Sequence, residues 1–166
     1  MGGLAQEPLV AFADDPSMVA AKIAVTDVTD DDIADVVLAR PADGGVDLHF
    51  LEGGAAPKGR GVYSGHFSRS IEAIQVAAGD VTGDRYGDLV VHAKDGAGAG
   101  ELWIFRGHAG GLSGTPERVF AGSRLLADVK IVVADLDGDG AAEVVLGRPA
   151  NRVVELYVYP GGSHSP

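Results

Sequence analysis

The 166-residue chain contains no cysteine, so disulfide bonds and thiol chemistry are excluded. It has no apolar run long enough to span a bilayer. No basic stripe accompanies its formal net charge of −11, which argues against nucleic acids and anionic membranes as partners. It also lacks a G-x-S-x-G motif, an H-E-x-x-H motif and a phosphate loop, so no catalytic motif supports an enzyme. We therefore expect neither nucleic-acid binding nor membrane insertion.

The first eight residues lack the basic and apolar regions of a secretion signal. A cytoplasmic location is expected if Met1 is the native start, and the alternative is that a secretion signal has been removed. The sequence leaves the compartment open between these two cases.

What the chain does contain is glycine and short apolar segments. Its 25 glycines and few long helical patterns predict a turn-rich, all-β fold. The length fits a single domain, residues 1–166, that can bury a core of its own.

Acidic side chains concentrate in three nine-residue segments, residues 27–35, 80–88 and 135–143. They read DVTDDDIAD, DVTGDRYGD and DLDGDGAAE, and together they hold twelve of the chain's 24 acidic residues. Similar strand-like segments follow each of them, which indicates a threefold repeat. The predicted strands are Lys22–Asp27, Asp35–Arg40, Val46–Leu51 and Gly61–Phe67; then Ala73–Asp80, Asp88–Ala93, Glu101–Arg106 and Glu117–Ala121; then Val129–Asp135, Glu143–Arg148 and Val153–Tyr159.

Oxygen-bearing side chains at alternate positions of a short loop are typical of calcium sites, because Ca²⁺ takes six to eight oxygen ligands. The position-twelve glutamate of an EF-hand is absent, and the flanking segments are β-branched, so strand–loop–strand sites are predicted instead. A hydrogen-bonded acidic turn that folds without metal is the alternative. The predicted ligands are Asp27, Thr29, Asp31 and Asp35; Asp80, Thr82, Asp84 and Asp88; and Asp135, Asp137, Asp139 and Glu143.

The sixth position of each segment distinguishes the three. Gly140 gives the third segment the backbone freedom for a sharp turn. Arg85 holds this place in the second segment, where a positive φ would cost on the order of 1 kcal/mol. Asp32 tolerates that conformation better, and we expect the third segment to bind calcium most tightly.

These residues resemble the FG-GAP/VCBS repeat, the blade unit of integrin α-subunit propellers. Leu38-Ala-Arg-Pro and Leu146-Gly-Arg-Pro resemble its "GAP" part, whereas His92-Ala-Lys-Asp departs from it and no copy has a clear "FG" part. The resemblance implies an integrin-like β-propeller of four-stranded blades, bound Ca²⁺ and an extracellular location. The implied blades are residues 20–67, 73–121 and 129–159, the last completed by the N-terminal strand at residues 8–13.

Other recurring side chains are candidates for ligand binding. Arg40, Lys94 and Arg148 recur at or next to one repeat position and could ring an opening that binds an anion. Trp103 and Tyr157 share a position with His49, where aromatic rings either stack on sugars or pack between blades. His92 belongs to the same candidate set. Pairing of the basic groups with neighbouring acids is the simpler alternative to an anion site.

Three blades are too few to close a propeller, which needs about four to eight. Two copies that exchange their N-terminal strands would form a six-bladed homodimer, and the rival is a fragment of a longer propeller. The function predicted from the resemblance is a calcium-binding, lectin-like scaffold for a carbohydrate or small molecule. The alternatives are an enzyme that acts on such a molecule in the axial pocket and a purely structural module.

Overall fold

The computed structural model describes residues 16–54, 58–66 and 71–162, with residues 58–66 described by their backbone. These residues form an all-β structure in which every strand pairing is antiparallel. The helical elements of this part are two short 3-10 turns, η1 (Pro16–Ala20) and η2 (Arg124–Leu126). Neither turn has the length or the apolar character to cross a membrane.

The strands form three main sheets and one small hairpin. The first sheet has the order β1-β2-β3-β4, the second β10-β7-β6-β5 and the third β11-β12-β13. Their bounds are β1 (Lys22–Thr26), β2 (Asp35–Ala42), β3 (Gly45–Glu52) and β4 (Lys58–His66); β5 (Ile71–Gly79), β6 (Asp88–Asp95), β7 (Gly100–Phe105) and β10 (Glu117–Ser123); β11 (Lys130–Ala134), β12 (Glu143–Ala150) and β13 (Val153–Tyr159). The hairpin pairs β8 (Gly107–His108) with β9 (Gly111–Leu112).

The repeat in the sequence is a repeat in the structure. Thr26 pairs with Asp35 across the first acidic segment, and Ala134 pairs with Glu143 across the third at the same repeat positions. The predicted strands lie within a few residues of those observed, although β4 begins at Lys58 rather than Gly61. The N-terminal strand predicted at residues 8–13 lies outside the described residues.

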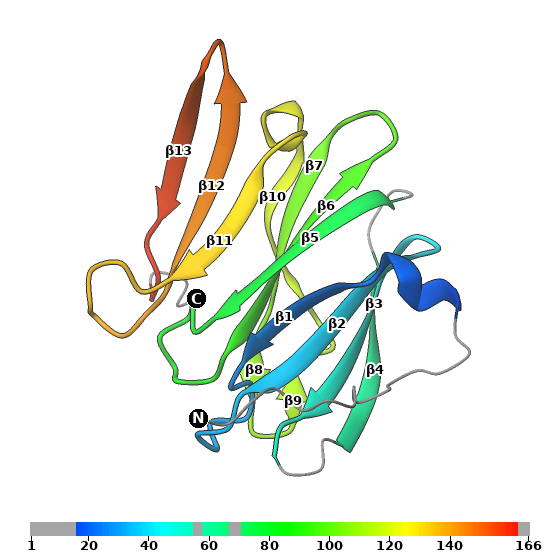
Figure 1. The fold of residues 1–166 in the computed structure, drawn as a ribbon, viewed down its shortest axis with the longest axis vertical. Coiled ribbons are helices and arrows are strands. Elements are labelled where there is room, and N and C mark those ends of the chain that lie inside the picture. Colours follow the sequence, from blue (N-terminus) through cyan, green and yellow to red (C-terminus); the bar gives the residue numbers. More distant parts are fainter. Residues whose placement is uncertain (1–15, 55–57, 67–70, 163–166) are drawn as a thin grey trace, which may run out of the picture.

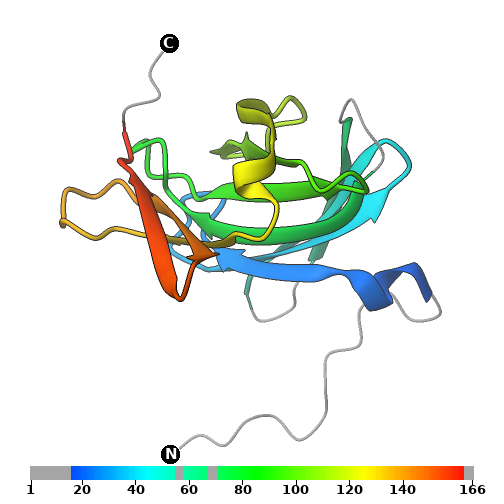
Figure 2. The ribbon, with the colours of Figure 1, turned by 90° about the horizontal axis from the view of Figure 1, so that it is seen from above.

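The first strands of the three sheets lie side by side, with β5 between β1 and β11 (Figure 1). Their arrows point the same way, so the acidic segments that follow them lie at one end of the molecule. Figure 2 keeps the same order of sheets, from the red C-terminal strand on the left to the cyan strands on the right.

Two hydrophobic cores hold the sheets together, one between the first and second sheets and one between the second and third. The run Leu89-Val90-Val91 in β6 does not alternate with polar residues, which predicts a strand buried on both faces. Leu89 and Val91 enter the first core and Val90 enters the second, which confirms this expectation for β6. The same expectation for the run Ile131-Val132-Val133 in β11 is wrong, because Val132 is 57% exposed. The second sheet is therefore the middle layer.

Candidate functional site

The three acidic segments, here called loop 1 (27–35), loop 2 (80–88) and loop 3 (135–143), share one backbone path. Their fourth and sixth positions have positive φ in every copy. The predicted turn at Gly140 is confirmed by its φ of 95°. Arg85 has a φ of 78°, and this backbone conformation is strained because arginine carries a Cβ. The six residues are Asp30 and Asp32, Gly83 and Arg85, and Gly138 and Gly140.

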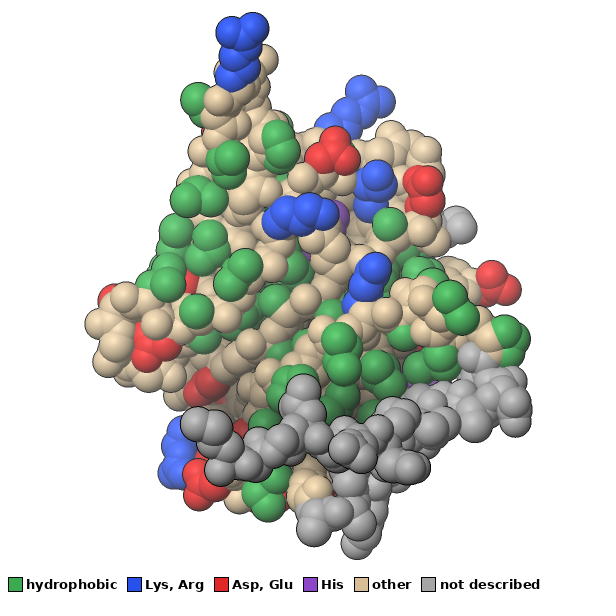
Figure 3. Space-filling view, viewed as in Figure 1, with side chains coloured by type: hydrophobic (Ala, Val, Ile, Leu, Met, Phe, Trp, Pro, Cys, Tyr) green, Lys and Arg blue, Asp and Glu red, His purple; other side chains and the backbone are tan. Residues whose placement is uncertain are grey.

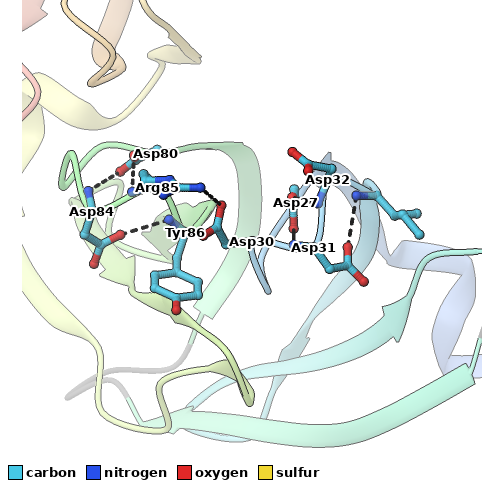
Figure 4. Close-up of polar contacts among 9 residues, drawn as sticks. Asp27, Asp30, Asp31, Asp32, Asp80, Asp84, Arg85 and Tyr86 are labelled. Atoms are coloured by element: carbon cyan, nitrogen blue, oxygen red, sulfur yellow. Dashed lines mark hydrogen bonds and ion pairs between the residues drawn. The ribbon is translucent and has the colours of Figure 1, made fainter.

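The first aspartate of each loop organises this path by accepting backbone hydrogen bonds. In loop 2, Asp80 accepts the N–H groups of Gly83 at 2.6 Å, Asp84 at 3.1 Å and Arg85 at 2.6 Å. Figure 4 shows the contacts of Asp80 with Asp84 and Arg85 beside the corresponding ones that Asp27 makes in loop 1. Such bonds gather the loop around one carboxylate without any ion, as an Asx turn does.

The last acid of each loop ties the loop to the end of the third strand. Asp88 accepts the N–H of Val81 at 3.0 Å through one oxygen and the N–H of Gly107 at 2.9 Å through the other. Burial raises the pKa of Asp88 to about 6, although hydrogen bonds from Gly107 and Thr82 oppose this shift. The sequence predicted these acids as metal ligands and missed this second role, for which the recurrent glycines Gly53, Gly107 and Gly161 were the available signal.

Asp35 and Glu143 make the equivalent contacts in their own loops. Asp35 accepts the N–H of Val28 at 2.9 Å, and Glu143 accepts the N–H of Leu136 at 2.7 Å. Both acids are buried, so these contacts hold the loops in place whether or not an ion is bound.

Loop 3 brings its carboxylates together most closely. One oxygen each from Asp135, Asp137 and Glu143 lies within 4.8 Å of the others. Among the described residues, this is the one group of three or more such side chains that is compact enough to hold a metal ion. The fourth predicted ligand, Asp139, accepts the N–H of Ala141 at 2.8 Å.

The predicted ligands of loops 1 and 2 do not form such a compact group of carboxylates. Asp31 and Asp84 each accept the backbone N–H two residues further on, at 2.9 Å and 3.1 Å. In loop 2, Thr82 donates its hydroxyl to Asp80 at 3.5 Å. In loop 1, the hydroxyl oxygen of Thr29 is buried and has no hydrogen-bond partner among the described residues.

The loops also join neighbouring sheets, which the sequence did not predict. The N–H of Gly87 in loop 2 donates to the carbonyl of Asp27 in loop 1 at 2.6 Å, and Ala142 in loop 3 donates to Asp80 in loop 2 at 2.6 Å. A Cβ on Gly87 would lie 2.3 Å from the hydroxyl oxygen of Thr26, so this position of loop 2 requires glycine. An exposed ion pair at 3.3 Å between Arg85 and Asp30 adds a second link (Figure 4).

Each of the basic candidates lies near an acidic side chain. Arg40 pairs with Asp47 on the neighbouring strand at 2.9 Å, and Arg148 pairs with Glu155 in the equivalent place. Lys94 lies 4.0 Å from Asp128. For Arg40 and Arg148, the structure favours pairing with neighbouring acids, which the sequence left as the simpler alternative.

The aromatic candidates differ in their surroundings. Trp103 packs against the first core, donates its ring N–H to Glu101 at 3.1 Å and lies under the guanidinium of Arg118. Tyr157 is more exposed and donates its hydroxyl to Glu155 at 2.8 Å, a bond that raises the pKa of the tyrosine. Packing between sheets therefore accounts for Trp103, whereas Tyr157 remains accessible.

His92 is a buried residue between the second and third sheets. Its Nε2 lies 2.6 Å from the carbonyl of Leu126, and its Nδ1 lies 3.5 Å from the side-chain nitrogen of Gln75. Burial lowers the pKa of His92 more than the hydrogen bond with Leu126 raises it, and the charges of Lys94 and Lys130 lower it further. The ring is thus held neutral.

The fold and loops together define an all-β repeat protein with acidic loops at one end of its sheets. No protein-family model matches the chain. Among curated proteins, the chain is similar to integrin alpha-E of Mus musculus, with 29% identity over 91 residues. This similarity covers 47% of the chain and 8% of integrin alpha-E, so the chain spans less than a tenth of that relative. It supports an integrin-like relationship for about half of the sequence.

Proposed function

We propose that the chain is a calcium-stabilised half of a β-propeller that serves as a scaffold for a carbohydrate or another small molecule. The observation that carries this proposal is the group of three carboxylate oxygens in loop 3, placed at the same point of a threefold repeat as the acids of loops 1 and 2. Repulsion between such groups favours a bound cation. The weak similarity to integrin alpha-E is compatible with a propeller scaffold.

The donor set fits calcium. The ligand atoms of Asp135, Asp137 and Glu143 are all oxygens, which suit a hard cation, and neither histidine nor cysteine takes part. Oxygens about 2.3–2.6 Å from one ion lie up to roughly 5 Å apart, and the 4.8 Å limit of the group agrees with this. The unpartnered Thr29 hydroxyl supplies a further oxygen at a predicted ligand position in loop 1.

Thermal unfolding in calcium and in chelator tests the metal half of the proposal. We expect a higher Tm in millimolar Ca²⁺, because an ion that binds only the folded chain stabilises it by about 2.7 kcal/mol at 100 times its Kd. Asp137→Asn should remove much of this gain because it deletes a charge from the loop 3 group. Asp43→Asn, in the exposed turn between β2 and β3, is the matched control. Equal melting curves in calcium and chelator would contradict occupied metal sites.

The assembly half of the proposal rests on equivalent residues with unequal burial. Leu102 in β7 is 1% exposed, whereas Leu156, at the same repeat position in β13, is 66% exposed. Ile104 and Val158 differ in the same way, at 1% and 53%. The third sheet covers Leu102 and Ile104 of the second sheet. No described residue covers the equivalent Leu156 and Val158 of the third sheet. Figure 3 shows hydrophobic side chains exposed over the region of β12 and β13.

The first sheet has the complementary open face. Ile131 in β11 is 9% exposed because it packs against the second sheet, whereas Ile23 at the same position in β1 is 63% exposed. Val25 beside it is also exposed. The open face of the third sheet is thus of the kind that packs on the open face of the first.

A second copy of the chain would cover both faces at once. Each third sheet would pack on the first sheet of the partner, and the six sheets would close a two-fold symmetric ring within the range of about four to eight blades known for propellers. The described part of the third sheet has three strands where the others have four. We propose that the strand at residues 8–13 of the partner supplies the fourth, with Leu9, Val10 and Phe12 against β13.

Light scattering tests the dimer. The expected mass is about 34 kDa, twice the 16.9 kDa of one chain. Leu156→Asp on the open face should reduce the mass to that of a monomer, whereas Leu125→Asp, at an exposed leucine in η2, should leave the dimer intact. Deletion of residues 1–13 should also abolish assembly. A soluble, cooperatively folded monomer of the unaltered chain would overturn the dimer and leave the calcium proposal standing.

A further inference from the structure

A pocket of about 550 Å³ opens where the first strands of the three sheets begin. Its volume lies within the range of about 300–1,000 Å³ typical of small-molecule sites. Residues from η1, β1, β5, β6 and the start of β11 line it. The acidic loops follow the other ends of β1, β5 and β11, so the pocket and the loops lie at opposite ends of these strands.

The pocket gathers positive charge in a strongly acidic chain. Three of the chain's four lysines line it: Lys22, Lys94 and Lys130. The two acids in its lining are Glu72 and Asp128. Lys22 and Lys130 are the first residues of β1 and β11, and neither belongs to the basic set that recurs in the sequence, Arg40, Lys94 and Arg148. Figure 3 shows basic side chains grouped over the face where these strands begin.

The floor of this pocket is polar and held in place. Buried His92 lies against the Leu126 carbonyl, and Gln75 donates its side-chain N–H to the carbonyl of Val129 at 2.6 Å. Burial lowers the pKa of His92, the hydrogen bond with Leu126 opposes this shift, and the charges of Lys94 and Lys130 add to it. The acid nearest to a lysine of the pocket is Asp128, 4.0 Å from Lys94.

Apolar side chains complete the walls. Pro41, Ile74 and Val129 line the pocket beside the charged groups. A lining that holds both ammonium groups and apolar side chains suits a small molecule with an anionic group and a carbon body. Lysine binds phosphate as a point charge, and a carboxylate offers the same kind of partner.

We propose that this pocket binds a small organic anion, a phosphate monoester or a carboxylate, through Lys22, Lys94 and Lys130. The site differs from the ring of Arg40, Lys94 and Arg148 expected from the sequence, because it shares only Lys94 with that set. The inference deepens the ligand-binding role proposed above and rests on it, since it names the site and the charge of the ligand.

Calorimetric titration of the full chain in 1 mM Ca²⁺ tests the proposal with two probes, glycerol 2-phosphate and succinate, and with glycerol as the neutral control. Saturable binding of at least one anion, and none of glycerol, is expected, and the stronger probe identifies the phosphate or carboxylate class. Lys130→Met and Lys22→Met should each weaken binding about tenfold, as expected for loss of one charged contact. Both lysines are exposed, so neither variant should unfold the chain, which thermal unfolding checks.

Arg152→Met is the matched control, because it removes one positive charge from the exposed turn between β12 and β13, outside the pocket. Its affinity should stay within about twofold of the unaltered chain, as expected for screened charges far from the ligand. No binding of either anion would overturn the proposal, and so would an equal loss in Arg152→Met and Lys130→Met. Either result would leave the chelator and light-scattering tests of the proposed function unaffected.

Discussion

The second and third sheets are built from the same repeat but have different neighbours. The second packs between two others and buries both faces of β6, whereas the third packs against one sheet among the described residues. The same difference extends to the loops: Val81 of loop 2 is buried, and its counterpart Leu136 of loop 3 is exposed. Equivalent apolar side chains therefore have different energetic roles, because burial depends on the next sheet in the series.

The largest expected effect separates two equivalent leucines. Leu102→Ala should lower the free energy of unfolding by about 2–5 kcal/mol, because it leaves a cavity in the second core. Leu156→Ala should change that of an isolated chain by less than about 0.5 kcal/mol, because the side chain is exposed. Urea denaturation measures both.

Protein concentration sharpens this comparison. In the proposed dimer, the loss caused by Leu156→Ala depends on chain concentration, because assembly contributes to stability by mass action. The loss caused by Leu102→Ala arises within one chain. An effect of Leu156→Ala as large as that of Leu102→Ala at every concentration would show that the third sheet is covered within the monomer.

The repeat was predictable from the sequence because its signals are local. Alternate acids, β-branched runs and recurrent glycines predicted the strands to within a few residues. The positive φ at Arg85 followed from alignment with Gly140.

Contacts between sheets were less predictable. The bond from Gly87 to Asp27 joins different repeats, and Lys22 and Lys94 line the same pocket although they belong to different sheets. Arg40 and Arg148 each lie opposite an acid on the adjacent strand, which explains why they form ion pairs. This strand register is visible only in the folded sheet. A pattern within one repeat therefore predicts a strand or a loop better than it predicts a site shared by several sheets.

An effect of intermediate size is expected for the pH dependence of stability. It arises from His92, which joins the second sheet to the segment before the third. Burial holds the pKa of His92 below its usual value of 6.5, whereas the unfolded chain takes up a proton near pH 6.5. The contribution of neutral His92 to stability is therefore complete above pH 6.5 and is lost as the pH falls below it. Urea denaturation between pH 7 and pH 5 should show a shallower loss in His92→Gln than in the unaltered chain.

Asp88 acts in the opposite direction. Its pKa of about 6 in the folded chain exceeds the usual aspartate value of 3.8, so proton uptake favours the folded state as the pH falls through 6. Because Asp88 is present in both chains, the difference between them isolates His92. His108→Gln, at an exposed histidine, is the control and should keep the slope of the unaltered chain. An unchanged slope in His92→Gln would contradict a pKa lowered by burial.

The smallest expected effect compares the sixth positions of loops 2 and 3. Arg85 has a φ of 78°, which costs a residue with a Cβ about 1–2 kcal/mol, whereas Gly140 adopts its φ of 95° freely. Arg85→Gly removes this strain, but it adds about 0.5–1 kcal/mol of unfolded-state entropy and loses the exposed pair with Asp30. A net gain of about 0.5 kcal/mol is expected by urea denaturation in chelator.

Arg85→Ala loses the same pair and keeps the Cβ, so it should be less stable than Arg85→Gly by about 1 kcal/mol. Gly140→Ala should destabilise loop 3 by a similar amount, since nothing but φ opposes a Cβ there. Equal stability of the Gly and Ala variants at position 85 would show that the loop relaxes out of the positive φ region.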